Sequence, residues 1–239
     1  GAAVARNLGI KKATGKYIAF LDSDDIFSPT KIQNQLFFME QNNLAYSHTA
    51  YKTFSNASDL VAVRAHQEHQ DSLSASITNL YPQIMRMCTI ATPTVMALKS
   101  VFSQFLFPEH LKVGEDICLW INISSQYPIG FLQEALTFVR IGKNSHAIDP
   151  LKLTEGNLNI ALYLISDPRH AQYKEPIAQL LSETAFALVG KDPNTPCITA
   201  SAIDFPTSKS DGNLQPVLSA YQIIKHRIRK ALKNVLGSR

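Results

Sequence analysis

Acidic residues follow a short apolar run near the amino-terminal end of the chain. Residues 17–21 read Tyr-Ile-Ala-Phe-Leu, and Asp22, Ser23, Asp24 and Asp25 come directly after them. An apolar run of this length predicts a strand buried on both faces of a mostly parallel sheet. Open α/β sheets bind their ligands at the carboxyl ends of such strands. Asp22 and Asp24 could therefore hold one hard divalent cation together with the oxygens of a substrate diphosphate.

A second pair of acids precedes an apolar segment in the middle of the chain. Gly114, Glu115 and Asp116 come just before residues 117–125, whose pattern predicts a helix. Carboxylates in the first turn of a helix interact favourably with the helix dipole. Capping of that helix is therefore the simplest interpretation of this pair.

The surrounding segments alternate between helix and strand, which is typical of an α/β fold. We expect a helix over residues 2–13, because Gly15 suits the position after a helix end, and another from Pro29 to about Asn43. The apolar patterns predict further elements, which are strands at 45–54, 60–65, 94–98, 129–132 and 136–141 and helices at 73–87, 154–165 and 174–190.

Four segments together resemble the family-2 inverting glycosyltransferases of GT-A fold. They are Ala-Arg-Asn-Leu-Gly-Ile at 5–10, the run from Ala13 to Asp25, the pattern Pro29-x-Lys31-Ile32-x-x-Gln35, and Gly-Glu-Asp-Ile-Cys-Leu-Trp at 114–120. The resemblance implies a partial GT-A, Rossmann-like domain over residues 1–148, with a mixed, mostly parallel sheet flanked by helices. A carboxy-terminal helical region would occupy residues 149–239.

The resemblance also assigns chemistry to the acids. Asp22 and Asp24 would bind a divalent metal, Mg or Mn, and the nucleotide-sugar donor, with Asp25 supporting the donor site. Asp116, with Glu115 beside it, is similar to the general base that deprotonates the acceptor hydroxyl. These roles agree with the reaction, because the attacking alcohol loses a proton while charge grows on the leaving diphosphate.

Four further residues are candidates for the site. Arg6 and Asn7 would contact the donor, since a guanidinium suits a diphosphate, although Arg6 could also be an ordinary surface residue. Trp120 could line the acceptor site or simply pack in the core. His146 could supply a third metal ligand.

The resemblance begins partway into the GT-A fold. Members of the family start with strands that hold the nucleotide base, and these would lie before Gly1. We therefore expect an amino-terminally truncated domain whose base-binding residues lie upstream.

Composition excludes several other classes of protein. The chain has 239 residues, is 45% hydrophobic and 18% charged, and contains three cysteines without the spacing of a zinc site. Residues 225–239 hold six cations and no acid, and subtracting these from the net charge of +4 leaves −2 for the rest. The basic character is thus local to the end of the chain, which argues against nucleic-acid binding.

Residues 217–236 predict a basic amphipathic helix that would either dock on the protein body or contact an anionic membrane surface. We therefore expect a cytoplasmic enzyme, peripheral on the inner face of the plasma membrane. It would move a sugar from a UDP-linked donor to a glycan or lipid-linked acceptor in bacterial surface-polysaccharide or lipopolysaccharide synthesis. Two alternatives remain: a non-catalytic GT-A remnant that binds a membrane or partner, and a nucleotidyltransferase that does not use Asp116 as a base.

Overall fold

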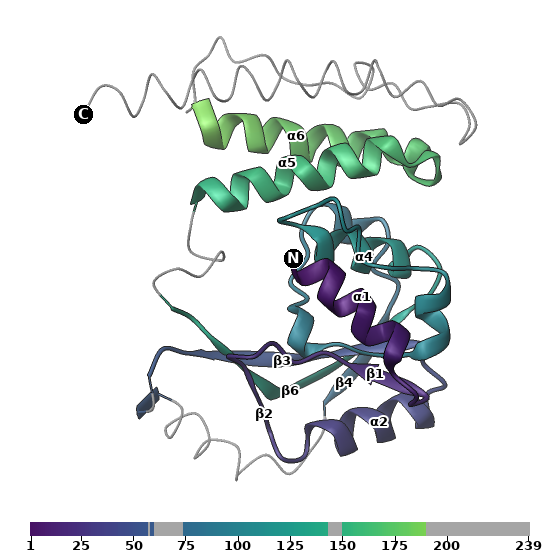
Figure 1. Ribbon diagram of the computed structural model, residues 1–239. Helices are drawn as coiled ribbons and strands as arrows, with labels where there is room; N and C mark the ends of the chain where they lie inside the picture. The colour runs from purple at the N-terminus through teal and green to yellow at the C-terminus, as the bar shows by residue number, and fades with distance from the viewer. Residues whose placement is uncertain (57, 60–73, 143–149, 190–239) are drawn as a thin grey trace. The chain divides into compact units, whose positions relative to one another are not determined.

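The computed structural model describes residues 1–56, 58, 59, 74–142 and 150–189 (Figure 1). The chain divides into two compact units. One consists of Gly1–Ile84 and Cys88–Asp149, and the other of Met85–Met87 and Pro150–Arg239.

A mixed sheet of six strands forms the centre of the first unit. Its order is β1-β5-β3-β6-β2, and β4 also pairs with β6. Strands β3 and β6 are parallel, and the other described pairings are antiparallel. The strands are β1 (Tyr17–Ala19), β2 (Ile26–Phe27), β3 (Tyr46–Phe54), β4 (Ala75–Thr78), β5 (Met96–Leu98) and β6 (Ile129–Arg140).

This sheet confirms the predicted α/β class but corrects two expectations. The sheet is mixed rather than mostly parallel. The apolar run before Asp22 indicates that its strand is buried, but it does not indicate the direction of the neighbouring strand. The segment 73–87, predicted as a helix, contains strand β4 and the short 3-10 helix η2 (Gln83–Met85) instead. Pairing of β4 with β6 supplies backbone hydrogen bonds that outweigh the local helical pattern.

Helices cover both faces of the sheet. Helix α2 (Lys31–Gln41) lies on one face, and α1 (Ala2–Lys12) and α4 (Glu115–Ser124) lie on the other (Figure 1). The core on the α2 face consists of Phe38, Met39, Leu44, Met96, Leu132 and Leu136. Aromatic rings pack edge to face in a second cluster, which consists of Phe20, Phe102, Phe107 and Trp120.

Two 3-10 helices flank β5. They are η3 (Thr92–Thr94), directly before the strand, and η4 (Lys99–Ser103), directly after it. Thr92 and Thr94 are both buried, so η3 is an internal segment rather than a surface loop.

The described part of the second unit is helical. Helices α5 (Pro150–Ser166) and α6 (Lys174–Val189) pack against each other and are joined by the 3-10 helix η6 (Pro168–Tyr173). None of the helices in the described ranges combines the length and apolar character needed to cross a bilayer. The predicted strand at 60–65 and the predicted helix at 217–236 lie outside the described residues.

Candidate active site

The turn after β1 presents the first group of acids. The amide of Phe20 donates to the carbonyl of Val95 (3.5 Å), and the amide of Asp25 donates to the carbonyl of Asp22 (3.1 Å). The chain therefore turns directly after the strand. Asp24 is exposed, whereas Asp22 and Asp25 are half-buried. Of these three carboxylates, that of Asp24 is the most accessible to a ligand.

Arg6 of α1 joins this turn to the beginning of α4. Its Nη2 donates to both carboxylate oxygens of Asp22 (2.9 and 3.1 Å), and its Nη1 donates to Oε1 of Glu115 (3.1 Å). The Arg6 side chain is 16% exposed, and its guanidinium lies 5.4 Å from the centre of the Phe107 ring. The interpretation of Arg6 as an ordinary surface residue is therefore wrong. One guanidinium connects acids from two distant parts of the sequence.

Glu115 occupies the first position of α4, immediately after a sharp change of chain direction. Gly114 has φ of 87°, a left-handed conformation that glycine adopts without strain. Glu115 is 9% exposed and faces Arg6. Burial, followed by the neighbouring charge of Asp116, raises the pKa of Glu115, and the nearby guanidinium opposes this effect. The Arg6 guanidinium therefore stabilises the charged form of a largely buried carboxylate.

Asp116 is half-buried and held at both carboxylate oxygens. The hydroxyl of Thr92 donates to Oδ2 (2.9 Å), and the amide of Ile117 donates to Oδ1 (2.8 Å). The acid pair lies in the first turn of the helix, as the capping interpretation expects. The same contacts give the Asp116 carboxylate a defined orientation, which a catalytic base requires.

Asp25 lies directly before β2 and completes the acidic group. Burial raises the pKa of Asp25 to about 6, and the charges of Asp24 and Asp22 add to this rise. The amide of Arg140, which donates to Asp25 Oδ1 (2.9 Å), opposes the rise. Arg6 lowers it slightly. The site thus groups one guanidinium with five carboxylates, those of Asp22, Asp24, Asp25, Glu115 and Asp116.

Two other candidates are placed elsewhere. Asn7 is buried: its amide nitrogen donates to the carbonyl of Phe107 (2.9 Å), and its amide oxygen accepts from the amide of Phe107 (3.0 Å). These contacts hold a loop, and donor binding by Asn7 stays a prediction. Trp120 is completely buried, so its ring lies in the core and not on an acceptor surface. Its indole N–H is a buried donor that has no hydrogen-bond partner among the described residues.

The acidic turn is the part of the site whose oxygens could contact a cation. No group of three or more His, Cys, Asp and Glu side chains in the described ranges is arranged to hold a metal ion. His146 lies outside the described residues. The oxygens that a cation could reach are those of the turn, where Asp24 is exposed and Asp22 is paired with Arg6. This set suits a hard divalent cation whose other ligands are waters and substrate phosphates.

Thr92 is the site residue that the sequence does not predict. It stands in the segment Ala-Thr-Pro-Thr before a predicted strand, and no spacing marks its hydroxyl for a role. Only the folded chain brings its hydroxyl within hydrogen-bond distance of Asp116.

Comparison with known proteins shows similarity to glycosyltransferases. Residues 1–104 match the model of glycosyl transferase family 2. An uncharacterized glycosyltransferase from Rickettsia felis is 44% identical over 182 residues, which are 76% of this chain and 29% of that protein. The Escherichia coli UDP-Glc:alpha-D-GlcNAc-diphosphoundecaprenol beta-1,3-glucosyltransferase WfaP is 37% identical over 131 residues, which are 53% of this chain and 45% of WfaP. The chain spans less than half the length of both relatives.

The fold agrees with this assignment. The crystal structure of S. aureus TarS 1-349 in complex with UDP superposes with a TM-score of 0.51 at 19% identity, over 78% of this chain and 52% of that chain. At this identity the likeness concerns the fold alone. Residues 1–104 thus match glycosyl transferase family 2, and the fold is similar to that of TarS 1-349; both findings agree with the family and fold that the sequence predicts.

Proposed function

We propose that the protein transfers a sugar from a nucleotide diphosphate-sugar to an acceptor hydroxyl, with inversion at the anomeric carbon. The observation that supports this most strongly is the bridge from Asp22 through Arg6 to Glu115. It brings the acidic turn, the predicted donor side, together with the helix end that carries Asp116. A single displacement needs a leaving-group site and a base within one substrate length of each other.

Asp116 is the proposed base. Its two oxygens are held by Thr92 and the amide of Ile117, so the carboxylate is oriented before substrate binds. As the acceptor hydroxyl attacks the anomeric carbon, its proton passes to this carboxylate, and the bond from that carbon to the diphosphate oxygen breaks.

The charge of the site supports binding of a divalent cation, Mg or Mn. Five carboxylates and one guanidinium leave a surplus of negative charge, which would repel a nucleoside diphosphate. Asp24, with Asp22 beside it, would hold the cation. When bound, such an ion supplies Lewis-acid stabilisation of the leaving diphosphate.

The relatives suggest the substrate class. WfaP is named for a UDP-glucose donor and a GlcNAc-diphosphoundecaprenol acceptor, and TarS 1-349 was solved with UDP. We infer a UDP-linked donor and a lipid-linked or glycan acceptor in bacterial surface-polysaccharide synthesis. A lipid-linked acceptor would make a peripheral position at the inner face of the plasma membrane useful, with residues 217–236 as the predicted contact.

Substitution of Asp116 in the natural full-length protein tests the proposal. With UDP-glucose and GlcNAc-diphosphoundecaprenol as probes, Asp116→Asn should lower kcat by at least about 100-fold, because general-base catalysis contributes this much. Asp24→Asn should lower activity and weaken its dependence on added Mn²⁺ or Mg²⁺. UDP release and sugar incorporation are the measurements.

Glu40→Gln is the matched control, since Glu40 is an exposed acid on α2 outside the site. It should leave activity unchanged. Retained transfer by Asp116→Asn would overturn the proposal and favour the non-catalytic remnant. Transfer of a nucleotide rather than a sugar would favour the nucleotidyltransferase.

A further inference from the structure

Hydrogen bonds anchor the segment 91–95 at every carbonyl group. Thr94 and Val95 are completely buried, and Thr92 is 3% exposed. The donors to the five successive carbonyls come from within the segment and from three other elements. The carbonyl of Ala91 accepts from the amide and hydroxyl of Thr94, and that of Thr92 accepts from the amide of Val95. The carbonyls of Pro93, Thr94 and Val95 accept, in that order, from the hydroxyl of Thr137, the side-chain amide of Gln35 and the amide of Phe20. A segment held in this way has little freedom to move.

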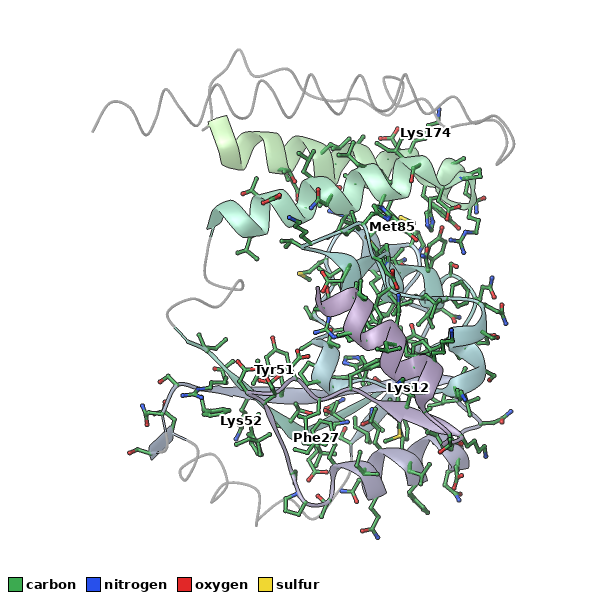
Figure 2. The ribbon with its side chains drawn as sticks, viewed as in Figure 1. Lys12, Phe27, Tyr51, Lys52, Met85 and Lys174 are labelled. Carbon is green, nitrogen blue, oxygen red and sulfur yellow. The ribbon has the colours of Figure 1, made fainter. Side chains whose placement is uncertain are left out.

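Gln35 provides the deepest of these anchors. Its Nε2 donates to the carbonyl of Thr94 and to the hydroxyl of Ser47 (both 3.0 Å), and its Oε1 accepts from Lys31 Nζ (2.7 Å). Lys31 and Gln35 are completely buried, and the Lys31 amine lies 4.2 Å from the centre of the Phe27 ring, which Figure 2 labels near α2. Because the Lys31 amine donates to Oε1, the amide is oriented with its N–H groups toward Thr94.

The same segment touches both halves of the site. Through Val95 it pairs with Phe20, two residues before Asp22, and through Thr92 it contacts Asp116. A buried threonine hydroxyl commonly bonds a nearby backbone carbonyl, as that of Thr94 does. The hydroxyl of Thr92 instead donates to a carboxylate from another element.

We propose that Thr92 is a positioning residue for the transfer reaction. It holds the carboxylate of Asp116 in the orientation that receives the acceptor proton, and Gln35 holds Thr92 in place through the backbone of the segment. This inference rests on the proposed function of Asp116 as the base. It adds a second requirement to that function, since the Asp116 carboxylate must also be held in the correct orientation.

Thr92→Val tests the inference, because it removes the hydroxyl and keeps the shape of the side chain. We expect kcat to fall about tenfold, the effect of losing one hydrogen bond to a charged group, with the donor KM unchanged within about twofold. Thr92→Ser retains the hydroxyl and should recover most of kcat. If Thr92→Val does not fold, Thr92→Cys takes its place, because a thiol of similar size is only a weak donor.

Thr184→Val is the matched control. Thr184 is a buried threonine of α6 whose hydroxyl donates to the carbonyl of Leu180, and its substitution should leave kcat unchanged. In an Asp116→Asn background, Thr92→Val should cause no further loss, since the group it positions is gone.

The outcomes separate this inference from the proposed function. An inactive Asp116→Asn together with wild-type kcat in Thr92→Val overturns the positioning role and leaves the base assignment intact. Failure of Thr92→Ser to recover activity, or a rise in KM with unchanged kcat, also overturns it. Wild-type activity in Asp116→Asn overturns the proposed function itself.

Discussion

Lys31 carries a buried amine whose protonation changes near neutral pH. Burial lowers the pKa of Lys31 from 10.5 to about 7, and the side chain is completely inaccessible. Between these two pH values the unfolded chain binds a proton that the folded chain has released, so the free energy of unfolding rises as pH increases above about 7. Lys31→Met should remove this rise, which amounts to at most about 1.4 kcal/mol per pH unit. Urea unfolding at pH 6, 7.5 and 9 measures it.

Lys16→Met is the control, because the Lys16 side chain is 70% exposed and its substitution should leave the pH dependence intact. At pH 9 the Lys31 variant should also be less stable than wild type, since Gln35 Oε1 loses its donor. Equal pH dependence in wild type and Lys31→Met would show that the buried amine keeps its proton through folding.

The sequence predicts which residues carry charge at the site but not how they meet. Asp22, Glu115 and Asp116 can be predicted because acids beside apolar segments are recognisable in the amino-acid sequence. The double contact of Arg6 and the contact of the Thr92 hydroxyl cannot be read from the sequence, since both join residues that are distant along the chain.

At the scale of elements, periodicity predicts burial better than it predicts pairing. The segments 129–132 and 136–141 read as two strands, because polar residues separate them. They form the single strand β6, whose register against β3 shifts between Thr49 and Tyr51. The bulge at this point accommodates Gln133 and Glu134, so the polar interruption bends a strand rather than ending it. Local sequence carries no information on which partner a strand chooses.

Strand β6 passes close to α2 at Gly130, and this contact allows a sharp prediction. A Cβ atom at this position would lie 2.5 Å from Leu44 Cδ1 and 2.6 Å from Phe38 Cε1. Gly130→Ala should therefore lower the free energy of unfolding by about 1–3 kcal/mol, the usual cost of overpacking a core. Chemical denaturation measures the change.

Gly9→Ala is the matched control, because a Cβ at Gly9 in α1 would meet no atom within 4 Å. It should raise the free energy of unfolding by about 0.5–1 kcal/mol, since alanine favours a helix over glycine. A Gly130→Ala protein as stable as wild type would mean that β6 and α2 do not approach each other this closely.

At the scale of the whole molecule, each compact unit has a core of its own. Leu136 belongs to the core between the sheet and α2, and Leu164 is completely buried in the unit that contains α5 and α6. The acids, Arg6 and Thr92 all lie in the first unit. Stability of the site should therefore depend on the first core.

Truncation of one leucine in each core tests this division. Leu136→Ala and Leu164→Ala should each cost about 2–5 kcal/mol of local stability, the range for a buried leucine replaced by alanine. Hydrogen exchange should show faster exchange in β3 and β6 for Leu136→Ala, and in α5 and α6 for Leu164→Ala, with the other unit unchanged. UDP binding should weaken only in Leu136→Ala. If either substitution accelerates exchange in both units equally, the two cores unfold as one cooperative structure, and the site depends on the helical unit as well.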